Sequence, residues 1–154
     1  MLKDLQREID LFVFELRGSI DVLSILIGFA YNLYGNTKET TRIDLNEARK
    51  ALNKDYRNEK MTHLINNLFE QEWFRYLNSL RNRIAHRLPL GLESELSLSG
   101  LPTHLYLPDD PDALSSSCEK KLDIPRNCRL WVEESCKFIE QVSDLLGEMF
   151  FTSW

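Results

Sequence analysis

Apolar residues recur at steps of three and four along four stretches of the chain, the spacing of one face of an α-helix. Over residues 2–34 the repeat has no break, and extra apolar residues widen it. We therefore expect one long helix that its own bundle covers on one side and a second subunit on the other. The regular positions are Leu2, Leu5, Ile9, Val13, Leu16, Ile20, Leu23, Ile27 and Tyr31, and the extra ones are Phe12, Phe14, Leu26 and Phe29.

A second helix is predicted to begin after Asp44, because Glu47 follows it at the spacing of a capping box. Its apolar repeat stops at the polar run 53–60, which predicts a break or an exposed turn. The repeat resumes at Met61 and continues as one helical pattern to Pro89. Proline ends a helix because it lacks the N–H donor and disfavours a helical residue before it.

Residues 89–127 differ from the rest, because they contain all five prolines of the chain. Apolar and polar residues alternate on both sides of Ser99-Gly100, which allows a short hairpin within this otherwise irregular segment. A last amphipathic helix is expected over residues 126–150. The predicted fold class is all-α: a bundle of four or five helices with a long irregular segment before the last one, in a single domain of residues 1–154.

The net charge of −5 is a poor match to a protein that coats long nucleic acids. The charge is unevenly distributed, however. Residues 42–87 hold ten Lys and Arg against six Asp and Glu, whereas the rest of the chain holds nine against eighteen. A basic segment in an acidic protein permits a small phosphate-binding site and argues against an extended one.

Three cysteines, Cys118, Cys128 and Cys136, form no CxxC pair, so neither a disulfide framework nor a zinc site is indicated. No metal or other cofactor is expected. The N-terminus is charged and does not resemble a signal peptide, and the most apolar stretch is too short to span a bilayer. These features predict a cytoplasmic protein with reduced thiols and no membrane partner.

The candidate site is a cluster of polar residues near the end of the helix that Pro89 terminates. Asn82 and His86 are one turn apart and lie about 40° apart around the helix axis, whereas Arg81 is offset from His86 by about 140°. Arginine grips phosphate with a planar set of donors, and histidine exchanges protons near neutral pH. Arg83 and Arg87 would add phosphate contacts.

Two interpretations of these residues remain open on chemistry alone. In the first, Arg81 and His86 act on a phosphodiester, the histidine exchanging a proton with a 2′-hydroxyl or a leaving 5′-oxygen. No metal is needed, because the nucleophile is already in the RNA. In the second, Arg81 pairs with a surface carboxylate and His86 is a partly buried structural histidine.

The string from Leu80 to Arg87 resembles the Arg-Asn-x-x-x-His signature of the HEPN superfamily, small all-helical proteins of prokaryotic toxin–antitoxin and defence systems. The resemblance implies a metal-independent endoribonuclease with a composite site in a homodimer cleft. It assigns catalysis to Arg81 and His86 and a supporting polar role to Asn82. RNA and a second copy would be the partners, with an antitoxin or other regulatory protein as a further candidate. Many family members are inactive, so a non-catalytic module that binds RNA or protein is the alternative.

Overall fold

The computed structural model describes residues 2–33, 44–86, 93–96, 102–108 and 121–151. The chain divides into two compact units. Unit 1 comprises Met1–Arg17 and Glu72–Glu133, and unit 2 comprises Gly18–Gln71 and Glu134–Trp154. The first and last helices contribute residues to both units. The single domain of residues 1–154 stays a prediction.

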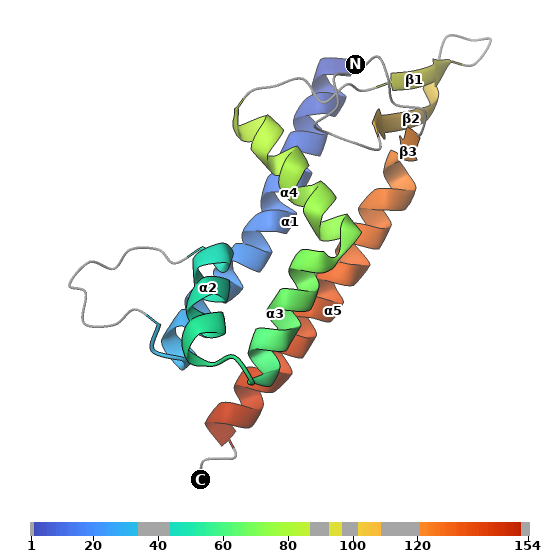
Figure 1. The fold of residues 1–154 in the computed structure, drawn as a ribbon. Helices are drawn as coiled ribbons and strands as arrows, with labels where there is room; N and C mark the ends of the chain where they lie inside the picture. Colours follow the sequence, from blue (N-terminus) through green and yellow to red (C-terminus); the bar gives the residue numbers. More distant parts are fainter. Residues whose placement is uncertain (1, 34–43, 87–92, 97–101, 109–120, 152–154) are drawn as a thin grey trace. The chain divides into compact units, whose positions relative to one another are not determined.

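The predicted mostly helical class is confirmed, and the described residues contain five helices (Figure 1). Both long helices end within a few residues of their predicted bounds. None of the described helices is long and apolar enough to cross a membrane. The helices are α1 (Leu2–Ala30), α2 (Leu45–Asp55), α3 (Lys60–Glu70), α4 (Glu72–Ala85) and α5 (Ile124–Phe151).

The apolar repeat that begins at Met61, predicted as one helix, is two helices. They are separated by Gln71, whose backbone is extended with φ −66° and ψ 130°. The Gln71 N–H still donates to the carbonyls of Asn67 and Leu68, which caps the end of α3. Any residue adopts this conformation without strain, so no glycine or proline is required to mark the break. The chain also passes from unit 2 into unit 1 at this residue.

Side-chain caps set the start of two helices. The predicted capping box of α2 is confirmed: Asp44 Oδ1 accepts the Glu47 N–H at 2.8 Å, and Glu47 Oε2 accepts the Asp44 N–H at 3.3 Å. Asp123 Oδ1 likewise accepts the Arg126 N–H at 2.9 Å at the start of α5. Pro125 fits this first turn because its missing donor has no helical partner there. The last helix therefore begins two residues before the predicted position.

The predicted hairpin is confirmed, as β1 (Glu93–Leu96) pairs antiparallel with β2 (Pro102–Pro108). A third strand, β3 (Lys121–Asp123), was not predicted; it pairs with the other edge of β2, giving the order β1-β2-β3. Tyr106 faces Glu93 on one side and Asp123 on the other. The segment 89–127, predicted as irregular, thus contains a sheet and ends at Asp123. Three residues are too few for alternation to be recognised.

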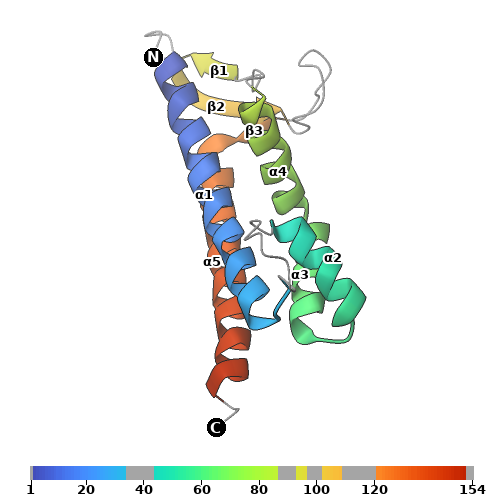
Figure 2. The same ribbon diagram turned by 90° about the vertical axis from the view of Figure 1, so that its left-hand side faces the viewer.

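One apolar core holds unit 1 together and joins the first half of α1, α4, β2, β3 and the start of α5 (Figure 1, Figure 2). The rings of Tyr76 and Trp131 lie against each other within it, with centroids 5.6 Å apart. Because α4 contributes three of the buried members, the core fixes which face of α4 points outward. The buried members are Ile9, Val13, Tyr76, Leu77, Leu80, Leu107, Ile124 and Trp131.

Unit 2 is held by α2 and α3 together with residues from α1 and α5. The Tyr56 hydroxyl donates to the Tyr31 carbonyl at 3.0 Å, and the two rings meet edge to face. Burial raises the pKa of the Tyr31 hydroxyl, and nearby Glu59 acts in the same direction. Between α2 and α3, Arg49 Nε donates to Asn66 Oδ1 at 2.8 Å. This unit contains none of the predicted site residues.

The core beneath the candidate site can be tested with a matched pair of leucines. Leu80→Ala should lower the free energy of unfolding by about 2–5 kcal/mol, because it removes a fully buried side chain. Leu130→Ala, at a leucine 43% exposed in the same unit, should cost less than about 1 kcal/mol. Urea unfolding of both variants measures the difference. Equal costs would contradict the packing described for α4.

Candidate functional site

The three residues predicted as catalytic lie together at the C-terminal end of α4. Arg81 and Asn82 lie among its last five residues, and His86 follows directly after Ala85. The His86 N–H donates to the Asn82 carbonyl at 3.0 Å, so helical hydrogen bonding continues through the histidine. All three residues are exposed. The structure therefore brings them together on a solvent-facing surface of unit 1.

The packing of α4 explains why these residues face solvent. Leu80 is fully buried and Ile84 packs against the same core. Asn82 stands two residues from each of them, which places it about 160° away around the helix axis. His86 is one turn beyond Asn82 and shares its face. Burying the leucine and the isoleucine thus turns the asparagine and the histidine outward.

Arg81 bends toward the face that Asn82 and His86 share. Its Nη1 donates to Asn82 Oδ1 at 3.3 Å, a long hydrogen bond. The contact brings the guanidinium against the Asn82 amide despite the offset around the helix. Among the described residues, no hydrogen bond engages the Asn82 amide nitrogen. No hydrogen bond holds the His86 imidazole within the described part of the chain.

The structural interpretation of the motif required a carboxylate partner for Arg81 and partial burial for His86. Neither feature is present in the residues that the structure describes: Arg81 bonds to an amide, and His86 is exposed. Of the two predicted phosphate contacts, Arg83 is half-buried and has other interactions. Arg87 lies outside the described residues. The role of both arginines stays a prediction.

Sequence reasoning missed three polar residues near this face. Arg75 and Asn78 stand on α4 before Asn82, at helical spacings that a search of the motif helix would have found. Arg17 comes from α1: its Nε donates to Asn78 Oδ1 at 2.6 Å, and its guanidinium lies over the Phe74 ring, 5.1 Å from the centroid. No local signal connects residues 61 positions apart.

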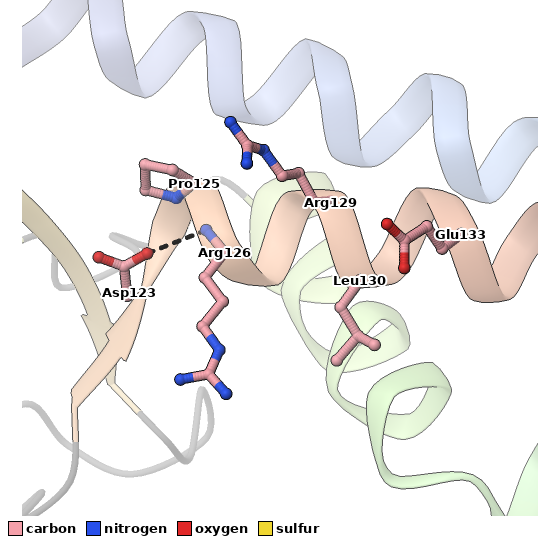
Figure 3. Close-up of a pocket in the computed structure, with 6 residues that line it drawn as sticks. All are labelled: Asp123, Pro125, Arg126, Arg129, Leu130 and Glu133. Carbon is pink, nitrogen blue, oxygen red and sulfur yellow. Dashed lines mark hydrogen bonds between the residues drawn. The ribbon is translucent and has the colours of Figure 1, made fainter.

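A shallow pocket of about 450 Å³ lies at the start of α5, also in unit 1 (Figure 3). Its two arginines, Arg126 and Arg129, extend to opposite sides of the helix rather than toward one point. Asp123 and Glu133 offset their charge, and the Asp123 carboxylate already caps the helix. The pocket therefore lacks the converging donors that an anion site needs. It is lined by Asp123, Pro125, Arg126, Arg129, Leu130 and Glu133.

Comparison with known proteins adds no further assignment. No protein-family model, curated protein or solved structure matches this chain. In the residues that the structure describes, no group of three His, Cys, Asp or Glu side chains is arranged to hold a metal ion. The candidate site is therefore defined by Arg81, Asn82 and His86 themselves and by the helix that presents them.

Exposure of the site predicts that its residues contribute little to stability. His86→Ala and Arg81→Ala should each change the free energy of unfolding by no more than about 0.5 kcal/mol, as surface substitutions usually do. Ile84→Ala, on the core side of the same helix, should cost at least about 1 kcal/mol. Thermal melts followed by circular dichroism compare the three. A His86→Ala loss as large as that of Ile84→Ala would give the histidine a structural role.

Proposed function

We propose that this chain is a metal-independent endoribonuclease of HEPN type whose active site contains Arg81, Asn82 and His86. The observation that carries the proposal is the contact between the Arg81 guanidinium and Asn82, on the exposed face that Asn82 shares with His86. A permanently charged phosphate-binding group and a proton-exchanging group thus stand five residues apart, about one and a half turns of the helix. Both are accessible to a large substrate.

The proposed reaction uses the 2′-hydroxyl of RNA as the nucleophile. The 2′-oxygen attacks the adjacent phosphorus and loses its proton to a base, the bond to the 5′-oxygen breaks, and that oxygen takes a proton from an acid. The products are a 2′,3′-cyclic phosphate and a 5′-hydroxyl. Arg81 would stabilise the charge that develops on the phosphoryl oxygens, and the Asn82 amide would donate a hydrogen bond to the same group.

Two proton transfers favour a site built from two copies of the chain. One imidazole cannot accept the 2′-proton and donate the 5′-proton at the same moment, so His86 and His86 of the partner subunit would divide these roles. Apolar side chains on α1 support self-association, because Val22, Leu26 and Phe29 are 56%, 48% and 70% exposed in the single chain. A Cβ added at Gly18 would meet no atom of the described residues within 4 Å.

Gly18 supports the same interface, because it lowers the stability of the helix and no described residue of its own chain packs closely against it. Glycine in a helix interior is about 1 kcal/mol less favourable than alanine. The open space at Gly18 leaves room for the close approach of a second helix. Its position one turn before Val22 places it on the same side of α1. We therefore include a homodimer through this side of α1 in the proposal.

The charge distribution supports a local substrate site. The chain is acidic, with a net charge of −5, yet the segment 42–87 that contains the motif is basic. Such a protein binds a short stretch of RNA without coating long strands. We extend the proposal to a cytoplasmic toxin or defence effector that an antitoxin or other regulatory protein restrains. The alternative is a non-catalytic module that binds RNA or a protein through the same face.

Catalysis is tested by cleavage of a mixed RNA in EDTA. Wild type should cleave, and His86→Ala should lower kcat by roughly 10²–10⁴-fold, the range for loss of an acid–base group. Arg81→Lys should also impair cleavage, since lysine keeps the charge but loses the planar donors. RNA binding and thermal stability of each variant are measured in parallel.

Each result of this assay selects one interpretation. Undiminished cleavage by His86→Ala would exclude the catalytic assignment, and cleavage that requires magnesium would exclude the proposed mechanism. A wild type that binds RNA without cleaving it, with binding weakened in Arg81→Lys, would establish the binding module instead. A fall in melting temperature without any effect on RNA would indicate a structural role.

The dimer is tested with two matched exposed leucines. Leu26→Asp should convert a dimer to a monomer, because the aspartate would place an unpaired charge in an apolar interface. Leu130→Asp, at a leucine of similar exposure on α5, should leave the dimer intact. Light scattering at micromolar concentration gives the mass, and the cleavage assay shows whether activity is lost with the dimer. A wild type that is monomeric at that concentration would contradict the shared site.

A further inference from the structure

The exposed face of α4 continues beyond the candidate catalytic residues. Arg75 stands seven residues before Asn82 and eleven before His86, which places it within about 20° of both around the helix axis. It is exposed. Among the described residues no hydrogen bond or ion pair engages it, although Glu72 stands one turn away. Its guanidinium is therefore available to a ligand that also touches the motif.

The distance along the helix decides what Arg75 can bind. At 1.5 Å per residue, the rise from Arg75 to His86 is about 16 Å. This is too far for both side chains to meet one phosphate. A ligand that contacts both residues must carry repeated negative charges along its length, as a single strand of nucleic acid does. A lone phosphate or a mononucleotide cannot span this face.

A second basic side chain, that of Arg17, is held beside the same exposed face of α4. Asn78 lies between Arg75 and Asn82 on α4, and its side chain holds the Arg17 guanidinium through the 2.6 Å hydrogen bond to Nε. The stacking of Arg17 over Phe74 restrains the group further. The positive charge of Arg17 is thus brought to the middle of the face. Arg17 and Arg75 thus lie on the side of α4 that carries Asn82, and the Arg81 guanidinium bends toward Asn82 from a neighbouring side of the helix.

We infer that single-stranded RNA lies along this face of α4, with the reacting phosphate at Arg81 and His86 and an upstream or downstream phosphate bound by Arg75. The inference rests on the proposed ribonuclease function and names how its substrate is held. Arg75 acts as a binding residue that positions the strand and takes no part in bond breaking. Arg17 adds charge to the path and holds Asn78 in place.

The test uses the full-length protein and a single-stranded oligonucleotide whose 2′-oxygens are methylated, so that the nucleophile is blocked and binding is measured alone. Arg75→Ala should weaken binding by roughly 3–10-fold near 0.1 M salt. It should also reduce the slope of log K against log salt concentration by about 0.7, the value for one phosphate contact on a single strand. Arg75→Lys should keep most of that slope, because the charge remains.

The matched control is Arg57→Ala, which removes an exposed arginine from the turn after α2 in unit 2. It should change neither the affinity nor the slope. With unmodified RNA, Arg75→Ala should raise KM while kcat changes by less than about twofold, the pattern of a lost binding contact. A residue with only a structural role would shift the melting temperature and leave the salt slope unchanged.

The results separate this inference from the proposed function. If wild type cleaves RNA and Arg75→Ala matches Arg57→Ala in KM, affinity and slope, the binding role of Arg75 is wrong and the ribonuclease stands. If wild type binds the oligonucleotide with an Arg75-dependent slope but never cleaves RNA, catalysis is wrong and the RNA path stands. A wild type that neither binds nor cleaves single-stranded RNA would overturn both.

Discussion

Burial of one side of α4 is the constraint on which the candidate site depends. Leu77 and Leu80 are fully buried in the core of unit 1, and Ile84 packs against it. Burial of a side chain of this kind contributes about 1.5–3 kcal/mol, whereas an exposed polar residue changes stability by a few tenths. The apolar residues therefore decide the rotation of the helix. Asn82 and His86 therefore face solvent, because the helical period places them on the side of α4 opposite the buried residues.

The same reasoning separates the two sides of α1. One side is buried inside the chain, as the full burial of Ile20 and Ile27 shows. On the other side, Val22, Leu26 and Phe29 are exposed to water. Single exposed apolar residues need no explanation, but three at helical spacing do. The sequence pattern already indicated a helix covered on two sides. The structure accounts for one of these sides, and the covering of the other by a second subunit stays a proposal.

The features that sequence predicted are those that local chemistry determines. The capping box at Asp44 and the hairpin between β1 and β2 depend on neighbouring residues, and both are confirmed. The orientation of Asn82 and His86 follows from the apolar repeat of their own helix. The break at Gln71 was missed because an extended residue between two helices needs no special side chain.

Contacts between distant segments account for the other omissions. The third strand is too short to leave a pattern, and it exists because the edge of β2 is there to pair with it. Arg17 reaches Asn78 only because the unit 1 core packs α1 against α4. The residues next to Arg17 and Asn78 in the sequence do not indicate this contact. The part of the site that lies outside the motif is thus a product of tertiary packing and could not have been predicted from the motif alone.

Charge screening determines how far the arginines of α4 would act on a bound RNA strand. At physiological ionic strength, electrostatic interactions between exposed groups decay over about 8 Å. Arg75 and Arg81 are six residues apart, a rise of about 9 Å along α4, so on the proposed RNA path each would act mainly on the phosphate nearest to it. The acidic remainder of the chain is screened in the same way and cannot cancel them at contact distance. Binding to this face would then depend on contact geometry along α4 more than on the net charge of the protein.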